Sequence, residues 1–573
     1  MPGVLYYNGD ILTMEPQLYA PAILVESGRI RAVGSKQQLE AAFGPGAEAF
    51  DLQGRTLMPA FIDPHSHITA YASTLALADL SQAKSFAEMK EILLGFMNRR
   101  DLPKGAWLIG FGYDHNRLAE HRHPDKALLN TVSAEIPVMI THKSGHMGAV
   151  NQRALEKAGI RADTPDPEGG HIGRVEGSRE PSGYLEEKAF MALAALVPVP
   201  GLEEQKALLQ QAEREYLKYG VTTVQDGLLQ EQGFNLMRDT PLHVDAVGFA
   251  DLKQSPTLLK EHPEYCKGYR DHFRLGGYKI ILDGSPQGRT AWMSEPYEDT
   301  PDGYCGYPVY SNAQVMQFIE TALRDGVQLL AHCNGDAAAE QLIACYEQVM
   351  AFRPEASSLR PVMIHAQTVR RDQLERMKKL HMIPSFFIAH TYYWGDVHRK
   401  QLGKRAYAIS PARTALGLDL PYTFHQDTPV LPPDMLRTVQ CAVTRSTETG
   451  AVLGREECIS PLEALRGVTV NAAYQYFEEK EKKDGNIFDQ KPMTIDEYES
   501  VSSRAAGSNT KSPGGNFTLY TNVYRESYNN TYYFQSIGNY AKTGAGSSES
   551  PSRSYYDYVT LTIPSSYTLT NST

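Results

Sequence analysis

Long apolar runs, close cysteine pairs and an excess of positive charge are all missing from this chain of 573 residues. No apolar stretch is long enough to cross a bilayer and no apolar leader opens the chain, so we expect neither a membrane span nor a secretion signal. The six cysteines are scattered, which argues against a disulfide framework and a zinc knuckle. The formal net charge of -11 argues against nucleic acid or an anionic membrane as the main partner. We therefore expect a cytoplasmic protein.

Strand-type and helix-type segments alternate along most of the chain. Hydrophobic residues make up 42% of the sequence, as in soluble globular proteins. Near-continuous apolar strands separated by helices are typical of a parallel sheet covered on both faces. At this length the pattern favours a (β/α)8 barrel, which carries its active site at the carboxyl ends of the strands. The apolar runs are 107–112, 138–142, 221–225, 244–249, 277–282, 327–332, 362–365 and 422–424.

The first 57 residues follow a different pattern. Short β-type runs are separated by turns at Gly9, Gly28 and Gly54, and residues 35–43 favour a short helix. We expect a small sheet before the main domain. Its strand-type runs are 4–7, 22–25, 30–33 and 49–52.

Two histidines separated by one residue end the apolar stretch that begins at Met58. In a strand, alternate side chains point to the same face, so His65 and His67 should lie on one side. Two imidazoles that converge in this way are half of a divalent metal site. The alternative is a chance His-x-His on a solvated face, and the other half of the site must come from elsewhere in the chain.

Further residues able to bind metal stand at the ends of other apolar runs. His332 ends the run 327–332, His365 ends the run 362–365, and Asp427 follows the run 422–424. A single buried histidine is more often a hydrogen-bonded core residue than a ligand. Here, however, such residues recur at one structural position on separate strands, and polar groups are rarely buried without a partner. We expect them to meet His65 and His67 at one end of the barrel.

Lys279 interrupts the apolar run 277–282. A buried and unpaired ammonium group is costly, so a lysine in such a strand finds a partner or is chemically altered. One alternative is an ion pair with Asp283. The other is carbamylation by CO2, which converts the cation into an anionic oxygen ligand that can bridge two metal ions.

The combined motifs resemble the amidohydrolase superfamily and, within it, the YtcJ-like branch (amidohydrolase family 3), which includes N-substituted formamide deformylases. The similarity extends from about Val4 to Tyr476. The motifs that carry it are Pro59-Ala-Phe-Ile-Asp-Pro-His-Ser-His67, Thr141-His-Lys-Ser-Gly-His146 with Val150-Asn151, Thr164-Pro-Asp-Pro-Glu-Gly-Gly170, Leu282-Asp-Gly-Ser285 with Gly288-Arg-Thr290, Ile364-His365, His390-Thr-Tyr-Tyr-Trp-Gly-Asp396 and Gln426-Asp427-Thr-Pro429.

This resemblance implies a TIM-like (β/α)8 barrel with a small β-sandwich formed from both chain ends. It places the first part of the sandwich at 1–58, the barrel at 59–476 and a remnant of the C-terminal sandwich segment at 477–499. It also implies one or two divalent metal ions, with zinc expected, at the barrel mouth. By analogy with relatives, His65, His67 and Asp427 of this chain would bind the first ion. His332 and His365 would bind the second ion, and a carbamylated Lys279 would bridge the two.

The implied activity is hydrolysis of a C–N bond in a small amide or formamide. The metal lowers the pKa of bound water toward ~7, the resulting hydroxide attacks the carbonyl carbon, and Asp427 handles the proton as general base. A deaminase or an ester or lactone hydrolase on the same barrel is the second alternative. A non-catalytic barrel with a binding tail is the third. A small molecule is the expected partner, and a homodimer is compatible with the sequence.

Several other residues are candidates for the substrate pocket, although each could equally serve loop or strand packing. They are His146, Arg289, His390, Trp394 and Asp396. Gln426 stands where relatives more often carry serine or glycine, so we expect it to crowd or hydrogen-bond Asp427. We expect the histidines of the polar loop, His115, His121 and His123, to be solvated.

The resemblance ends before the last 74 residues, which are rich in Ser, Thr, Tyr, Asn and Gly and contain almost no Leu or Val. Such a composition has little to bury, so residues 500–573 are expected to be poorly ordered, or foreign to the family through a fusion or an altered reading frame. The alternating Tyr/Thr runs at 516–524 and 555–563 have strand propensity. A small added β-module is therefore the alternative.

Overall fold

The fold divides into two units. The computed structural model describes residues 3–44, 46–99, 105–115, 117–142, 147–198, 200–300, 303–479, 520–528, 531–537 and 557–562. Unit 2 comprises the described residues between Ala72 and Gln211, and unit 1 comprises those up to Tyr71 and from Ala212 onward. The two boundaries fall within helices α2 (Ile68–Thr74) and α7 (Leu202–Lys218).

Unit 1 is organised around a sheet of eight parallel strands. Their order is β6-β13-β14-β15-β16-β17-β18-β19. The inner strands are buried along almost their whole length, as expected when helices cover a parallel sheet. The strands are β6 (Phe61–Ile62), β13 (Val221–Leu229), β14 (Asp245–Asp251), β15 (Phe273–Ile281), β16 (Gln328–Cys333), β17 (Val362–His365), β18 (Ile383–Phe386) and β19 (Thr423–Phe424).

Six of the eight predicted strand runs belong to this sheet, and two do not. The runs 107–112 and 138–142 form β8 (Leu108–Tyr113) and β9 (Val138–His142), which lie in the sheet of unit 2. Our placement of these two runs in the barrel was therefore wrong. Apolar strand patterns look alike in any buried parallel sheet, so the pattern alone does not tell one sheet from another. Instead, β6 and β18 complete the large sheet.

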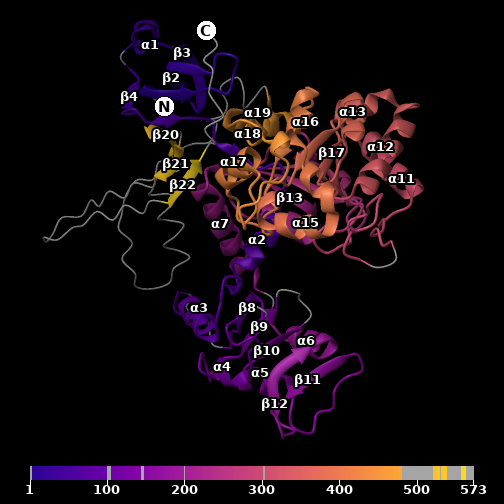
Figure 1. Cartoon of the computed structure of the whole chain (residues 1–573). Helices are drawn as coiled ribbons and strands as arrows, with labels where there is room; N and C mark the ends of the chain where they lie inside the picture. The colour runs from indigo at the N-terminus through magenta and orange to yellow at the C-terminus, as the bar shows by residue number, and fades with distance from the viewer. Residues whose placement is uncertain are drawn as a thin grey trace, which may run out of the picture. The chain divides into compact units, whose positions relative to one another are not determined.

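Helices connect and cover the strands of the large sheet. Figure 1 shows α11, α12 and α13 side by side, and α11 and α12 both contact β16. Sequence signals fix the ends of α11: Ser311 and Gln314 form a capping box, and Gly326 ends the helix in the left-handed region. The helices of unit 1 are α1 (Lys36–Phe43), α8 (Glu231–Arg238), α9 (Leu258–Glu261), α10 (Pro263–Cys266), α11 (Asn312–Asp325), α12 (Asp336–Met350), α13 (Arg371–Lys379), α14 (His390–Tyr393), α15 (Gly395–Leu402), α16 (Ala412–Gly417), α17 (Met435–Thr444), α18 (Pro461–Gly467) and α19 (Val470–Gln475).

The chain begins with a five-stranded sheet, as the turn pattern of the first residues predicts. The strands are β1 (Val4–Leu12), β2 (Tyr19–Glu26), β3 (Arg29–Gly34), β4 (Glu48–Asp51) and β5 (Thr56–Leu57). Apolar side chains on one face form a core that includes Ile11, Ile23 and Leu52. The predicted boundaries of the sandwich and the barrel stay predictions.

Three strands lie in the C-terminal tail. They are β20 (Tyr520–Tyr528), β21 (Thr531–Ile537) and β22 (Asp557–Thr562), and they form an antiparallel sheet. Two of them overlap the Tyr/Thr runs for which a β-module was the alternative. The other residues of 500–573, and residues 480–499 of the predicted sandwich remnant, lie outside the described residues.

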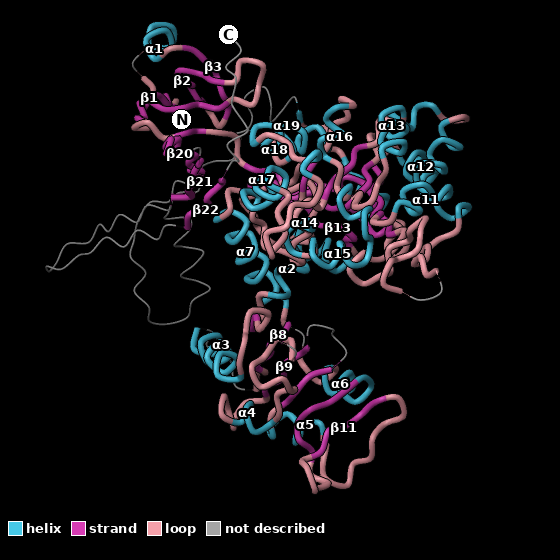
Figure 2. The backbone as a smooth tube through the Cα atoms, viewed as in Figure 1, coloured by secondary structure: helices cyan, strands magenta, loops and turns pink. Residues whose placement is uncertain are grey.

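Unit 2 has its own six-stranded sheet, in the order β11-β12-β10-β9-β8-β7. Figure 2 shows its strands with helices α3 to α6 around them. The remaining strands are β7 (Ala78–Asp79), β10 (Met147–Val150), β11 (Gly170–Arg174) and β12 (Pro181–Glu186), and the helices are α3 (Phe86–Arg99), α4 (Lys126–Asn130), α5 (Gln152–Ala158) and α6 (Glu187–Ala194). In both units, the helices of the described ranges are too short or too polar to cross a membrane.

Asn151 ties strand β9 to helix α5 in unit 2. Its side chain is fully buried, and its Oδ1 accepts hydrogen bonds from the backbone N–H groups of Val138 (3.0 Å) and Ala154 (2.9 Å). Its amide donates to the carbonyl oxygens of Ser133 and Ile136, both at 2.8 Å. The motif residue Asn151 thus has a structural role as the N-cap of α5.

Asn151→Ala should destabilise unit 2 by about 2–4 kcal/mol, because it leaves several buried polar groups without partners. Hydrogen–deuterium exchange of the amides in β9 and α5 measures the loss. The neighbouring Gln152→Ala is the control, since Gln152 makes its side-chain contacts at the surface. Equal protection in the two variants would contradict this role.

Candidate metal centre

The six predicted metal-binding residues meet at the carboxyl ends of the strands of the large sheet. His65 and His67 follow β6, and Asp427 follows β19. The other three, Lys279 in β15, His332 in β16 and His365 at the end of β17, come from neighbouring strands. Parallel strands end at one edge of their sheet, so residues far apart in the sequence come together there. Ligand atoms of His65, His365 and Asp427 lie within 4.8 Å of one another.

Asp427 lies at the centre of this group. Its Oδ1 is 3.3 Å from Nε2 of His65 and 3.3 Å from Nε2 of His67. Its Oδ2 is 3.9 Å from Nε2 of His365. Burial raises the pKa of this carboxyl group, but the nearby histidines outweigh burial, so that its pKa lies well below the usual range. Asp427 is therefore a carboxylate at neutral pH.

The proton positions on His65 and His67 follow from their hydrogen-bond partners. Nδ1 of His67 lies 2.6 Å from the carbonyl oxygen of Gly227, which can only accept a hydrogen bond. Nδ1 of His65 lies 2.6 Å from Oε1 of Gln225. The amide of Gln225 is oriented by its own donations to the carbonyl of Pro64 and the hydroxyl of Tyr476. Both histidines therefore carry a proton on Nδ1.

The second nitrogen of each ring points at an acceptor. Nε2 of His65 and Nε2 of His67 both face the same carboxylate oxygen of Asp427. That oxygen is buried and accepts no hydrogen bond. Burial lowers the pKa of His65 to about 3, so its Nε2 presents a lone pair, whereas Asp427 outweighs burial and raises the pKa of His67. The lone pairs of His65 and Asp427 repel, so positive charge between these groups, a metal ion or a proton on His67, satisfies them. The donor set of imidazole nitrogens and a carboxylate oxygen fits a zinc-type ion.

His332, His365 and His425 form a second row of histidines. Nδ1 of His332 is 3.0 Å from Nε2 of His365, so a proton or a metal ion must lie between these nitrogens. Nδ1 of His365 is 3.1 Å from Nε2 of His425, whose Nδ1 contacts the hydroxyl of Ser385 at 2.8 Å. Burial first, and the neighbouring charges second, hold the pKa of all three histidines below the usual value. Neutral imidazole is the form that binds metal.

Lys279 faces this group and not Asp283. Its Nζ lies 3.2 Å from Nε2 of His65, and burial lowers its pKa to about 7. Asp283 instead accepts backbone hydrogen bonds from Trp292 (3.0 Å), Asn334 (2.9 Å) and Gly335 (2.7 Å). Among the described residues there is no Lys279–Asp283 ion pair, so that alternative was wrong. Backbone donors satisfy Asp283 without a cation.

The backbone is strained at two of the predicted ligands. His365 has φ 73° and Asp427 has φ 54°, a region that residues other than glycine rarely adopt. Such strain persists where the surrounding structure enforces it, and it often occurs at functional sites. Here it accompanies the placement of both side chains at the centre of the group.

The predicted substrate-pocket residues have different environments. His390 is buried, contacts Nε2 of His398 through its Nδ1 (3.0 Å), and lies against Trp394 with ring centroids 4.5 Å apart. Phe387 connects this pair to the metal centre, since its ring packs against both His390 (4.7 Å) and His425 (5.3 Å). His390 and Trp394 therefore lie beside the centre.

The other pocket candidates are engaged elsewhere or not described. Arg289 forms a two-point ion pair with Asp299, and Asp396 binds Thr447 and Thr449. These contacts match the packing alternative for both residues. His146 lies outside the described residues.

Gln426 does not contact Asp427, contrary to our expectation. Its amide donates to the carbonyl of Asp434 at 2.7 Å and to the hydroxyl of Thr438. Successive side chains of an extended segment point to opposite sides, so Gln426 faces α17 while its neighbours face the centre.

Sequence reasoning missed two residues that orient the site, His425 and Gln225. The same alternation that pairs His65 with His67 pairs His425 with Asp427, so the spacing could have identified His425. Gln225 ends a predicted apolar run and is a polar residue at the correct strand end. A search for metal ligands alone overlooks Gln225, because this residue does not bind metal itself but accepts a hydrogen bond from Nδ1 of His65 and so orients the ring.

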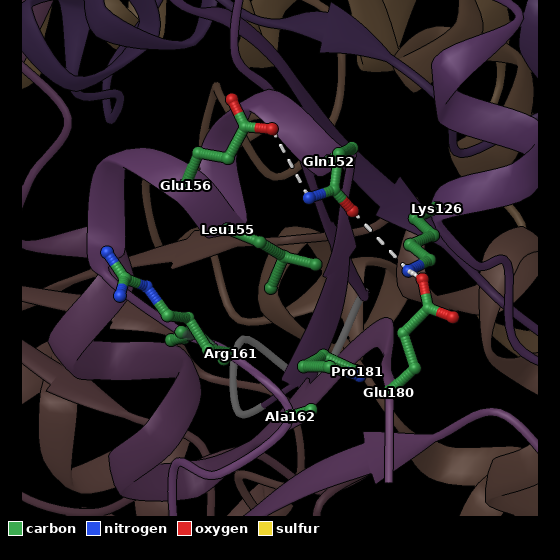
Figure 3. A pocket seen from close by; sticks show the side chains of 9 residues that line it. Lys126, Gln152, Leu155, Glu156, Arg161, Ala162, Glu180 and Pro181 are labelled. Atoms are coloured by element: carbon green, nitrogen blue, oxygen red, sulfur yellow. Dashed lines mark hydrogen bonds and ion pairs between the residues drawn. The ribbon is translucent and has the colours of Figure 1, made fainter. Parts of the chain in front are cut away.

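Unit 2 contains a hollow that shares no lining residue with the candidate metal centre. It has a volume of about 360 Å³, and Figure 3 shows Lys126 beside Glu180 and Gln152 in its lining. Lys126 forms an ion pair with Glu180 and a hydrogen bond with Gln152. None of the predicted site residues lines it.

Comparison with known proteins agrees with this geometry. The model of the amidohydrolase family matches residues 48–491. The chain belongs to the amidohydrolase family. The predicted resemblance is thus confirmed, and membership supports the expected hydrolase class.

Individual relatives span most of the chain. YtcJ of Bacillus subtilis is 28% identical over 495 residues, covering 83% of this chain and 91% of YtcJ. An N-substituted formamide deformylase of Arthrobacter pascens is 28% identical over 504 residues, covering 83% of this chain and 89% of the deformylase. An uncharacterized metal-dependent hydrolase from Pyrococcus furiosus shares the fold, with a TM-score of 0.66, 24% identity and coverage of 83% of this chain and 95% of its own.

Gly227→Ala should weaken zinc binding by roughly 10- to 100-fold, the range for residues that orient metal ligands. An added Cβ would lie 2.9 Å from Cε1 of His65 and 3.1 Å from Cε1 of His67, so both rings would have to move. Calorimetric titration of the metal-free protein with ZnCl2 measures the effect. The control is Gly417→Ala, where a Cβ meets no atom within 4 Å. Equal zinc affinities in the two variants would contradict this role of Gly227.

Proposed function

We propose that this protein is a metal-dependent hydrolase that cleaves the C–N bond of a small amide or formamide-type substrate. The observation that carries the proposal is the buried Oδ1 of Asp427, which faces the Nε2 atoms of His65 and His67 and accepts no hydrogen bond. This arrangement favours a bound cation. Family membership supports hydrolysis, and the similarity to a formamide deformylase supports a C–N bond as the target.

The residues that would hold the metal are those at the strand ends. We assign His65, His67 and Asp427 to one zinc ion and His332 and His365 to a second. A bound divalent cation supplies Lewis acidity, which polarises a carbonyl group and acidifies water. Nζ of Lys279 lies 3.2 Å from Nε2 of His65, so its amine is next to the first group.

Asp427 would move the proton. As a carboxylate it accepts a proton from the attacking water while the water oxygen bonds to the carbonyl carbon. The carboxyl group of Asp427 then donates that proton to the leaving nitrogen as the C–N bond breaks. One group can serve as base and then as acid because each step leaves it in the form that the other requires. Positive charge beside Asp427, on a neighbouring histidine or a bound cation, would keep it ionised before the reaction.

The aromatic group beside the centre would contact the substrate. Phe387, His390 and Trp394 pack together, and Phe387 also packs against His365 and His425. Burial, followed by the charge of His398, holds the pKa of His390 well below the usual value. A neutral His390 beside apolar rings could hydrogen-bond one polar atom of an uncharged amide and so orient it, while the rings contact the apolar part of the substrate.

Lys279 would react with CO2 to form a carbamate. The ammonium group first loses a proton. The neutral amine nitrogen then bonds to the carbon of CO2 and a second proton leaves to solvent, so the cation is replaced by an anionic oxygen ligand. Burial favours this reaction because it lowers the pKa of Lys279 to about 7 and so increases the neutral fraction.

We further propose that the eight-stranded sheet closes as a barrel. Two hydrogen bonds support closure: the backbone N–H of His67 donates to the carbonyl of Thr428 at 2.8 Å, and that of Ile62 donates to Val468 at 2.9 Å. Both connect the β6 edge with segments that follow β19. A sandwich that uses both chain ends belongs to the same proposal.

Asp427→Asn should reduce hydrolysis by about 100-fold or more, the usual scale for loss of a general base, while most of the zinc stays bound. Turnover of a panel of amides, formamides, esters and aminopurines by the zinc-loaded enzyme measures the effect. Asp419→Asn is the control, because Asp419 is exposed. Near-normal turnover in Asp427→Asn would move the role to another group, with His390 next to be tested. Esters or aminopurines as the preferred substrates would overturn the C–N amide assignment.

Lys279→Ala should lower zinc content and activity together, with partial rescue by short carboxylic acids such as acetate or propionate that fill the vacated space. Zinc is measured by mass spectrometry after dialysis, with and without the added acid. Lys378→Ala, at an exposed position of α13, is the control. Wild-type zinc content in Lys279→Ala would show that Lys279 is no ligand, and a single-ion site should then replace the bridged pair.

A further inference from the structure

Unit 2 contains a second group of metal-type side chains, which the reaction proposed above does not use. Asp114 and His115 directly follow β8, and His142 ends β9. These strands are parallel neighbours, and Tyr113 is paired with His142 in the register. The three residues thus share one strand-end edge, as the ligands of the large sheet do. Asp114 and His142 are buried, and His115 is half-buried.

The ligand atoms of these three residues converge. One nitrogen or oxygen from each lies within 4.8 Å of the other two. Nδ1 of His115 is 3.3 Å from Nε2 of His142, which in turn is 3.9 Å from Oδ1 of Asp114. Tetrahedral zinc with bonds of about 2.0–2.1 Å places its ligand atoms about 3.3–3.4 Å apart. The 3.3 Å separations at Asp427 show the same spacing in the metal centre of unit 1.

The surrounding side chains hold the group in place. The ring of His123 stacks on His115 with centroids 4.0 Å apart, and its Nδ1 contacts the hydroxyl of Tyr113 at 3.1 Å. The ring of Tyr184 also packs against His123, with ring centroids 4.4 Å apart. Our expectation that His115 and His123 are solvated was therefore wrong, whereas His121 is exposed. Burial and the neighbouring His115 lower the pKa of His123 to about 4, so this ring is neutral.

We propose that Asp114, His115 and His142 bind a further divalent transition-metal ion of the zinc type, distinct from those of unit 1, with all protein ligands supplied by unit 2. Two imidazoles and one carboxylate are a common zinc donor set and leave a fourth position for water or another ligand. Half-burial of His115 gives the ion a path to the site. The competing structure is a hydrogen-bonded pair in which a proton lies between His115 and His142.

Metal titration distinguishes these two structures in the full chain. The starting protein carries His65→Ala and His67→Ala, which remove two ligands of the unit 1 centre, and is freed of metal by chelation. Addition of ZnCl2 should then load an ion in unit 2, in addition to any zinc that His332 and His365 still hold. Further His115→Gln or His142→Gln should weaken this binding by about 100-fold or more, since each removes a direct ligand.

The control is His171→Gln in the same background. His171 forms an ion pair with Asp166 at 2.7 Å on the surface of unit 2, so this variant removes an equivalent histidine without touching the cluster. It should keep its zinc. With CoCl2 in place of ZnCl2, a tetrahedral site gives intense visible absorption, which His142→Gln should abolish and His171→Gln should not.

A second comparison does not depend on the folding of the double variant. In the otherwise unchanged chain, His142→Gln should bind one zinc ion fewer than His171→Gln. Loss of zinc only upon changes at His65 and His67, with unchanged binding in His115→Gln and His142→Gln, would overturn the proposal and establish the hydrogen-bonded pair. Conversely, failure of the hydrolase assay with zinc retained in unit 2 would concern the proposed function alone.

Discussion

The hydrogen bonds from His65 and His67 to Gln225 and Gly227 are the constraint on which the rest of the site depends. Because Nδ1 of each ring is committed to an oxygen acceptor on β13, each Nε2 must face Asp427. That commitment requires a fixed register between β6 and β13, which pair in parallel at Val221 and Phe61. It also requires a residue without a side chain at Gly227, where the two rings pass closest to the backbone. The first half of the candidate metal centre is thus positioned by one pair of strands.

The second half depends on a different set of contacts. Asp283 is buried and holds the backbone of Trp292, Asn334 and Gly335, so the segments after β15 and β16 stay together at the edge of the sheet. His425 supports His365 from the opposite side. Asp283 and His425 can affect metal binding without being ligands, because they hold the neighbouring histidines in fixed orientations. The strained backbone at His365 and Asp427 is maintained by this surrounding network.

Unit 2 places candidate ligands at strand ends as unit 1 does, but on two strands in place of five. In both, parallel strands end together, and side chains that follow the strands converge although they are distant in the sequence. Asn151 fixes β9 against α5 and so supports the strand that carries His142.

The motifs of the chain predicted the family by resemblance. Its apolar runs predicted six strands of the large sheet and the convergence of His65, His67, Lys279, His332, His365 and Asp427, because local alternation and apolar strand ends record which side chains face the strand-end edge. Only the tertiary structure decided that residues 107–112 and 138–142 belong to a second sheet, since a buried strand has the same pattern in any sheet. The partner of Lys279, the roles of Gln225 and His425, and the burial of His115 likewise came from the fold. These features depend on contacts between segments as many as 251 residues apart, and hydrogen-bond partners at such separations leave no local pattern in the chain.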